Sequence, residues 1–268
     1  MNSRRFISLS LAAFLVFAPF AAGVQPANAL DGIPAGCVPK TNDYKFAHCQ
    51  IDRSGKFSMA VIGDSHARSW IGPMRKLARK YSWKLTVVSK SACPILDPDS
   101  IPKHIPSPSC AQWNRKLLDY LSGSGKFDLI VTASSSLVTH GYKSYSDSFA
   151  SVAPKITATG ATLLVIRDNP KPKSGFQKCL RLHGSTAALD CAQIRWKALN
   201  PRDKMPQAVS GSAGVKVADF TDAYCGPQVC SPIIDGILVY RDHSHITGAF
   251  ANHLTPKLDS VIPERFKN

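Results

Sequence analysis

The sequence contains no internal repeat at the periods of solenoid proteins and no long low-complexity tract. These absences exclude repeat architectures and linkers of biased composition. Hydrophobic residues make up 44% of the 268 positions and aromatic residues 9%, an ordinary globular composition that excludes a disordered tail protein. At this length we expect one domain of α/β size with elaborated loops.

Acidic residues are scarce. The chain has 18 Asp and Glu against 33 Lys and Arg, which gives a formal net charge of +15. A basic surface of this kind is drawn to anionic lipid or to acidic wall polymers. Nucleic acid would be the competing partner, but the basic residues are scattered and do not interleave with aromatic residues along a stripe. The sequence therefore predicts no nucleic-acid partner.

Long hydrophobic runs are also missing, with one exception at the N-terminus. Two arginines precede an apolar run, residues 6–24, which is followed by Ala-Asn-Ala at 27–29. This order is typical of a secretory signal peptide, so we interpret residues 1–29 as a signal that is removed after Ala29. An uncleaved membrane anchor is the alternative, although Pro19 interrupts the run. We expect a secreted or extracytoplasmic protein of the cell envelope.

None of the eight cysteines has a partner at the C-x-x-C spacing of many zinc sites. In an exported protein, an even number of cysteines favours structural disulfides. The connectivity cannot be deduced from sequence, but pairing of neighbours is the simplest arrangement because each bridge then closes a short loop. We therefore expect no metal site and the disulfides Cys37–Cys49, Cys93–Cys110, Cys179–Cys191 and Cys225–Cys230.

After an irregular lead-in, residues 30–55, the rest of the chain (56–268) alternates short apolar runs with segments of helical apolar spacing. This alternation predicts a parallel sheet covered by helices on both faces. Five prolines in the segment 93–110 predict a surface loop there. The expected strands are residues 57–62, 85–88, 127–132, 161–166 and 215–220, and the expected helices are 67–81, 112–121, 145–159 and 247–258.

The loop after the first expected strand reads Gly63-Asp64-Ser65-His66-Ala67. In parallel-sheet folds, sites form beyond the carboxyl ends of the strands. A serine where a strand turns into a helix exposes its hydroxyl at the sheet edge and adds its N–H to the positive helix end, where an oxyanion can bind. Gly63 permits the tight turn, and Asp64 can cap the helix. The alternative is a helix cap without chemistry.

A second group of polar residues lies near the other end of the chain, in the segment 240–247. Asp242 and His245 are three positions apart, so the carboxylate can hold one imidazole nitrogen while the other takes a proton from a serine. His243 is the immediate neighbour of Asp242 and should point elsewhere. The alternatives are surface histidines beside a capped helix, or a metal site using His243 and His245, for which no third ligand is suitably spaced.

Together these loops resemble the SGNH (GDSL-type) hydrolases, and more closely the SGNH domains fused to membrane acyltransferases of acyltransferase family 3. The resemblance spans residues 57–258. It rests on the Gly-Asp-Ser-His-Ala segment at 63–67, on the block 230–247, and on Cys-Ala-Gln-Trp-Asn at 110–114, which opens a helix. It implies a three-layer α/β/α sandwich with a parallel, flavodoxin-like sheet.

The resemblance also implies the roles of individual residues. Ser65 would be the nucleophile, His245 the base, and Asp242 the partner that orients the base. Domains of this family act on O-acyl groups, usually acetyl, of extracytoplasmic glycans.

Two loops depart from the wider superfamily, which supplies an oxyanion-hole glycine after the second strand and an asparagine after the third. Here these loops are residues 89–92, Ser-Lys-Ser-Ala, and residues 133–136, Ala-Ser-Ser-Ser. Any residue can donate its backbone N–H, so Ser91 can stand in for the glycine, and the Ser134 hydroxyl is the nearest replacement for the asparagine. With the Ser65 backbone N–H, these are the expected oxyanion donors.

We therefore expect an exported serine O-acyltransferase or carbohydrate esterase that moves acyl groups, mainly acetyl, on cell-envelope carbohydrate through an acyl-Ser65 intermediate. The resemblance to transferase-fused domains favours transfer. Because the membrane acyltransferase half is not in this sequence, the chain either works with a separate membrane acyltransferase as acyl donor or acts alone, and a cell-envelope glycan is its acceptor or substrate. No cofactor is expected. The alternatives are a non-catalytic module of the same fold that binds an envelope glycan and, less favoured, a metal-dependent esterase.

Overall fold

The structure is a computed structural model that describes residues 33–268 except 35, 102–107, 137–142 and 200–203. The expected signal peptide, residues 1–29, and its cleavage site after Ala29 lie outside the described residues. Within the described ranges, none of the helices combines the length and apolar character that a membrane span requires.

A six-stranded sheet forms the centre of the molecule, with the strand order β1-β3-β2-β4-β5-β7. The last five strands in this order run parallel to one another, and β1 is antiparallel to β3. Every residue of β4 and β5 is buried, as in a parallel sheet covered on both faces. The parallel strands have the order of flavodoxin-like sheets, which confirms the predicted fold class. The strands are β1 Cys49–Asp52, β2 Ser58–Gly63, β3 Lys84–Ser89, β4 Leu129–Thr132, β5 Thr162–Ile166 and β7 Val215–Ala218.

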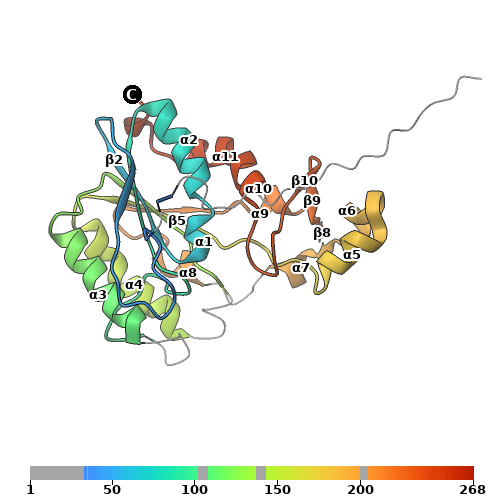
Figure 1. Cartoon of the computed structure of the whole chain (residues 1–268), viewed down its shortest axis with the longest axis horizontal. Coiled ribbons are helices and arrows are strands. Elements are labelled where there is room, and N and C mark those ends of the chain that lie inside the picture. Colours follow the sequence, from blue (N-terminus) through green and yellow to red (C-terminus); the bar gives the residue numbers. More distant parts are fainter. Residues whose placement is uncertain (1–32, 35, 102–107, 137–142, 200–203) are drawn as a thin grey trace, which may run out of the picture.

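Helices on both faces complete a three-layer α/β/α sandwich (Figure 1). One core lies between the sheet and α2, α10 and α11, and a second lies between the sheet and α3, α4 and α8. Successive residues of β2 point alternately into the two cores: Met59 and Val61 into the first, Ala60 and Ile62 into the second. These helices are α2 Ile71–Tyr81, α3 Pro108–Ser122, α4 Lys143–Thr157, α8 Met205–Val209, α10 Gly248–His253 and α11 Thr255–Val261.

Two of the expected helices are each divided into two shorter helices, and in both cases a proline lies in the first turn of the second one. The helix expected at 67–81 is instead α1, Ser65–Arg68, followed by α2. In one continuous helix, Pro73 would clash with the carbonyl of Ser69 and leave it without a donor, whereas the first turn of a new helix accommodates a proline. The helix expected at 247–258 divides in the same way, because Pro256 occupies the first turn of α11.

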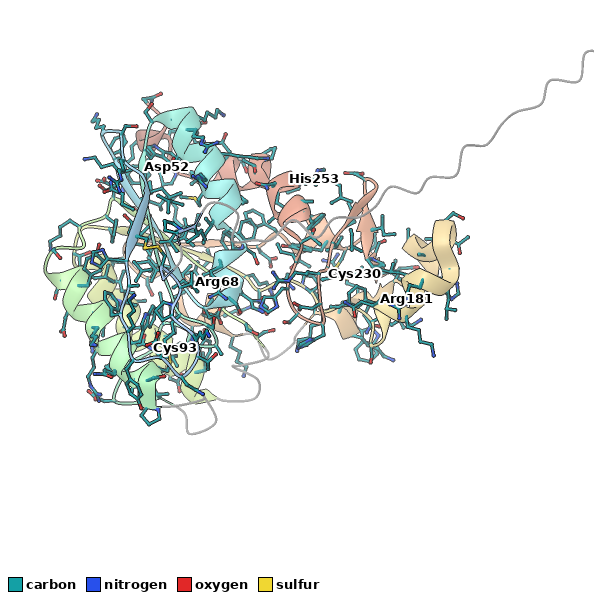
Figure 2. The ribbon with its side chains drawn as sticks, in the orientation of Figure 1. Asp52, Arg68, Cys93, Arg181, Cys230 and His253 are labelled. Carbon is teal, nitrogen blue, oxygen red and sulfur yellow. A yellow bond between two sulfur atoms is a disulfide. The ribbon has the colours of Figure 1, made fainter. Side chains whose placement is uncertain are left out.

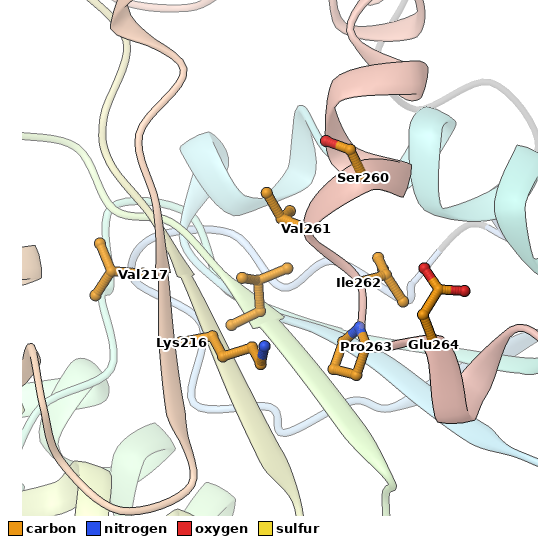
Figure 3. Close-up of a pocket in the computed structure, with 8 residues that line it drawn as sticks. Lys216, Val217, Ser260, Val261, Ile262, Pro263 and Glu264 are labelled. Carbon is orange, nitrogen blue, oxygen red and sulfur yellow. The ribbon is translucent and has the colours of Figure 1, made fainter.

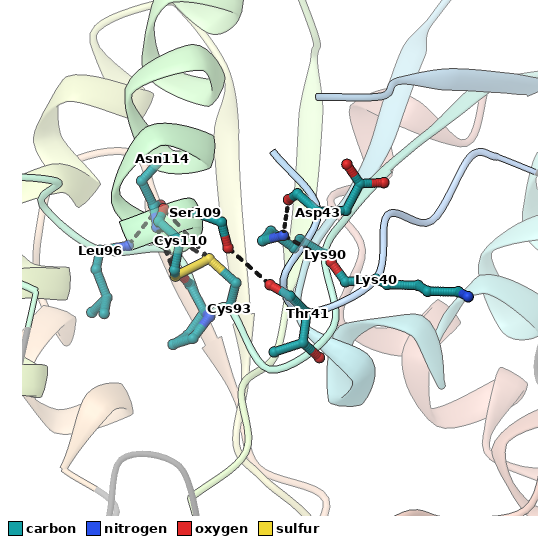
Figure 4. The surroundings of a disulfide bond; sticks show 10 residues. Lys40, Thr41, Asp43, Lys90, Cys93, Leu96, Ser109, Cys110 and Asn114 are labelled. Atoms are coloured by element: carbon teal, nitrogen blue, oxygen red, sulfur yellow. Dashed lines mark hydrogen bonds between the residues drawn. A yellow bond between two sulfur atoms is a disulfide. The ribbon is translucent and has the colours of Figure 1, made fainter. Parts of the chain in front are cut away.

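The proline-rich segment 93–110 is expected to be a surface loop, but part of it is buried. Ile95 and Leu96 are fully buried. Asn114 of α3 holds this part of the loop, because its Oδ1 accepts the Leu96 N–H at 3.0 Å (Figure 4). Helix α3 also begins earlier than expected, at Pro108, since proline is tolerated in a first turn.

The lead-in, expected to be irregular over residues 30–55, contributes the edge strand β1. Its four residues, Cys-Gln-Ile-Asp, show no apolar run that would indicate a strand. The lead-in is also held from inside the protein by Lys90, which follows β3 and is fully buried. Lys90 Nζ donates to the backbone carbonyls of Lys40, at 2.9 Å, and Asp43 (Figure 4). The lead-in therefore packs as part of the domain.

A lobe, residues 176–198 and 225–238, extends from the carboxyl side of the sheet (Figure 1). It contains α5 Phe176–His183, η1 Gly184–Thr186, α6 Ala187–Asp190, β6 Gln193–Ile194, α7 Arg195–Ala198, β8 Val229–Cys230, β9 Ile233–Ile234 and β10 Ile237–Leu238. Two further short helices are α9 Thr221–Tyr224 and η2 Glu264–Phe266.

Four disulfides join cysteines that are neighbours along the chain, and two of them brace the lobe. The bridges are Cys37–Cys49, Cys93–Cys110, Cys179–Cys191 and Cys225–Cys230.

Replacing Lys90 tests how the lead-in is held. In Lys90→Met, two carbonyls lose their buried donor, so we expect the free energy of unfolding to fall by about 1–3 kcal/mol in denaturant titration. Lys126→Met is the matched control, because the exposed Lys126 also donates to a backbone carbonyl, that of Ser122 at 2.9 Å. Equal effects of the two substitutions would contradict the role assigned to Lys90.

Candidate active site

Ser65 lies where β2 turns into α1. Gly63 has a φ of 140°, and a Cβ at this position would come within 3.0–3.2 Å of three neighbouring atoms, so the turn requires glycine. Asp64 is fully buried and caps α1. Its Oδ1 accepts the His66 N–H at 2.8 Å, and its Oδ2 accepts the Ser135 N–H at 2.9 Å. Asp64 thus begins the helix and ties it to the loop after β4.

Asp242 and His245 lie in a tight turn closed by an antiparallel bridge between Tyr240 and Ile246. Asp242 Oδ1 accepts the backbone N–H groups of Ser244 and His245, both at 2.9 Å. These bonds hold the carboxylate beside the imidazole, so that His245 Nδ1 lies 2.9 Å from each carboxylate oxygen. The turn therefore orients the histidine through its own aspartate.

The two loops meet at the carboxyl edge of the sheet. His245 Nε2 lies 2.8 Å from Ser65 Oγ, although 180 positions separate the two residues. Ser65, His245 and Asp242 therefore form one continuous chain of hydrogen bonds. The site stays accessible, because the side chains of His245 and Asp242 are 20% and 33% exposed. His243 is exposed and takes no part in this chain.

The surroundings set the charges of this triad. Burial would raise the pKa of Asp242, but the backbone N–H donors of His245 and Ser244 and the imidazole outweigh burial and hold that pKa well below its usual value. Burial lowers the pKa of His245, and the positive charge of His66 lowers it further against the opposing effect of Asp242. Near neutral pH the carboxylate is charged and the imidazole neutral, as a general base requires.

The three expected oxyanion donors keep free hydrogen-bonding capacity. Among the described residues, neither the Ser65 N–H nor the Ser91 N–H has an acceptor. The Ser134 hydroxyl is buried and also lacks a partner within the described ranges. The bond from Ser135 to Asp64 places the loop of Ser134 beside that of Ser65. The role of these groups in binding an oxyanion stays a prediction.

A second histidine–carboxylate pair, not expected from the sequence, adjoins the triad. His66 Nδ1 lies 2.6 Å from Asp168 Oδ1, and the two side chains are only 4% and 5% exposed. Asp168 also accepts the N–H groups of Ser136 at 2.7 Å and Asn169 at 2.9 Å. The centre of the His66 ring is 4.7 Å from that of His245. The sequence contained one signal for this pair: Asp168 follows the strand β5 just as Ser65 follows β2, so both residues are expected at the carboxyl edge of the sheet.

This pair places a positive charge next to the triad. Burial would lower the pKa of His66, but the Asp168 carboxylate outweighs burial and raises that pKa to about 9. Burial would raise the pKa of Asp168, yet the charge of His66 and the hydrogen bonds that Asp168 accepts lower that pKa. The pair is therefore an imidazolium and a carboxylate at neutral pH. Because like charges repel, this imidazolium favours the neutral form of His245.

A surface pocket of about 440 Å³ lies elsewhere, between β5, β7 and the segment 260–264 (Figure 3). Its lining includes Leu164, Lys216 and Val217, and none of its residues belongs to the triad. In the part of the chain that the structure describes, no group of three or more His, Cys, Asp or Glu side chains is placed to hold a metal ion.

Residues 36–260 match the family model of the SGNH domain (fused to AT3 domains). Since this match covers well over half of the chain, the chain belongs to that family. The expected resemblance is thereby confirmed.

Two solved structures match this chain. One is the periplasmic domain of a lipopolysaccharide acetyltransferase from Salmonella ser. Paratyphi A, with a TM-score of 0.60 and 16% identity over 78% of this chain and 84% of that chain. The other is a family two carbohydrate esterase from Clostridium thermocellum in complex with cellohexaose, with a TM-score of 0.45 and 12% identity over 81% of this chain and 66% of that chain. A comparison with curated protein sequences gave no match.

The buried His66–Asp168 pair makes stability depend on pH. Because the folded pKa of His66 is raised from 6.5 to about 9, its contribution is fully present below pH 6.5 and is lost as the pH rises through 9. We expect the free energy of unfolding of the wild type to fall across this window, and the fall to be clearly smaller in His66→Gln.

The matched control for this measurement is His183→Gln. His183 pairs with Asp190 at 2.8 Å, but both side chains are more than 40% exposed. The control should keep the wild-type slope of stability against pH. A His66→Gln variant with that same slope would contradict a buried imidazolium.

Proposed function

We propose that this protein is an exported serine enzyme that moves acyl groups, chiefly acetyl, on cell-envelope carbohydrate through an acyl-Ser65 intermediate. The observation that carries the proposal is the continuous chain of hydrogen bonds from Ser65 Oγ through the imidazole of His245 to the carboxylate of Asp242. This is the arrangement that activates a serine nucleophile.

The first half of the reaction forms the acyl-enzyme. Ser65 Oγ attacks the carbonyl carbon of the acyl ester, and its proton passes to His245 Nε2. The tetrahedral intermediate then expels the alcohol, which takes that proton from His245. Asp242 holds Nδ1–H throughout and stabilises the transient imidazolium. The carbonyl oxygen, negative in the intermediate, would accept hydrogen bonds from the Ser65 and Ser91 N–H groups and the Ser134 hydroxyl.

The second half transfers the acyl group. A sugar hydroxyl or water loses its proton to His245 Nε2 and attacks the acyl-Ser65 carbonyl, which releases the serine. Hydrolysis and transfer differ only in this acceptor. Membership in a family of domains fused to AT3 domains supports transfer to a glycan, with a separate membrane acyltransferase as the acyl donor.

The compartment is part of the same proposal. Four disulfides are typical of proteins that fold in an oxidising, extracytoplasmic environment. The N-terminal pattern over residues 1–29 supports export by a cleaved signal peptide. The net positive charge suits a protein that works among anionic envelope polymers.

Three single substitutions test the proposal in a spectrophotometric assay with an activated acetyl ester. Ser65→Ala removes the nucleophile and His245→Ala removes the base that takes its proton, so we expect kcat to fall by about 10³-fold or more in each. Asp242→Asn should also lower kcat, because it loses the charge that stabilises the imidazolium. Ser122→Ala, an exposed serine on α3, is the control and should match the wild type.

If the wild type turns the ester over no faster than Ser65→Ala, the catalytic proposal is wrong. Saturable binding of an envelope glycan by such an inactive protein would then favour a carbohydrate-binding module of the same fold.

A further inference from the structure

The guanidinium of Arg68 contacts the loop that follows β3. Arg68 is the last residue of the short helix that Ser65 begins, and it is labelled near the middle of the molecule in Figure 2. Its Nη1 donates to Ser89 Oγ at 3.2 Å and its Nη2 to Ser91 Oγ at 3.3 Å. It therefore links α1 to the loop of Ser91, which is expected to supply an oxyanion donor.

Within the described ranges, Arg68 has no countercharge in direct contact. Among the described residues, no carboxylate lies within 4 Å of its guanidinium. The nearby carboxylate of Asp64 is already engaged, since both of its oxygens accept backbone N–H groups. A guanidinium carries five N–H donors, and only two are used by the serine hydroxyls. Within the described ranges, no acceptor is found for the other three.

Further positive charge gathers at the same place. Arg241 precedes the catalytic aspartate, and its Nε lies 3.3 Å from Asp242 Oδ2, so that this carboxylate is shared with His245. Burial lowers the pKa of Arg68 and the charge of Asp64 opposes this, while the charge of Arg241 lowers the pKa further. An anion bound at this edge of the sheet would be attracted by both cations.

We propose that Arg68, supported by Arg241, forms an anion subsite beside Ser65 that selects an acidic sugar, one carrying a carboxylate or a phosphate, as the acyl carrier or acceptor. The inference rests on the proposed function and names its substrate class. A guanidinium offers two parallel N–H groups to a carboxylate or phosphate, whereas a neutral sugar offers only hydroxyls. The subsite would hold the acidic group while a neighbouring acyl ester faces Ser65 Oγ.

The first test compares the hydrolysis of three acetyl esters: those of methyl glucoside, methyl glucuronoside and a glucose phosphate. We expect the wild type to favour one or both acidic esters in kcat/KM. In Arg68→Gln, the acidic-to-neutral ratio should fall by about 10- to 100-fold, the effect of losing a hydrogen bond to a charged group. The two acidic esters distinguish a carboxylate from a phosphate as the preferred anion.

The control variant is Arg115→Gln. It removes the same charge from α3, where Arg115 pairs with Asp99 and is 54% exposed. It should keep the wild-type ratio, which separates a local subsite from the general attraction of a basic protein for acidic sugars. A ratio unchanged in Arg68→Gln, or no preference in the wild type, overturns the proposal. An equal loss on all three esters would mean that Arg68 only positions the Ser89 and Ser91 loop.

A binding measurement keeps this inference separate from the catalytic proposal. Titration calorimetry with a glucuronate-containing oligosaccharide and its neutral counterpart uses Ser65→Ala, alone and combined with Arg68→Gln. We expect Ser65→Ala to bind the acidic oligosaccharide at least about 10-fold more tightly and the double variant to lose this difference. If the wild type shows no turnover in the ester assay, this binding result would still support the subsite, although the catalytic proposal would be wrong. Equal affinity for both oligosaccharides would reject the subsite.

Discussion

The hydrogen bond between Ser65 Oγ and His245 Nε2 depends on the order of strands in a parallel sheet. Strand β2 lies near the middle of that sheet, so its carboxyl end opens onto the edge at which the chain returns before α10. Asp64 fixes the angle at which the helix leaves the strand, because one carboxylate both caps α1 and holds the loop after β4. The reactive geometry therefore follows from backbone architecture and needs few specialised side chains.

Charge is distributed around this edge in an ordered way. Three buried or half-buried carboxylates each have fixed partners: Asp64 has two backbone N–H groups, Asp168 has His66, and Asp242 has His245. The imidazolium of His66 is thus stable next to His245, whose own pKa is lowered. Arg68 is different, because in the described part of the chain its guanidinium donates to two serine hydroxyls and to no carboxylate. An acidic substrate would supply the negatively charged partner for Arg68.

Much of this could be predicted from the sequence, and the reasons for the rest are physical. The strands, the position of Ser65 and the spacing of Asp242 and His245 are predictable from short motifs, because each depends on residues that are neighbours in the chain. The strand β1 was missed because an edge strand needs no apolar run. The His66–Asp168 pair joins residues 102 positions apart, and only the order of β2 and β5 in the sheet brings them together. The division between α1 and α2 was readable from Pro73, whose missing N–H ends a helix.

The most direct test of the central claim is the rate at which a fluorophosphonate labels Ser65, followed by peptide mass spectrometry between pH 4 and pH 8. The account predicts one adduct, on Ser65, and a labelling rate that rises with a midpoint below 6.5, because the pKa of His245 is lowered and only its neutral form accepts the proton. An adduct elsewhere, or a rate at Ser65 that does not change with pH, would contradict it.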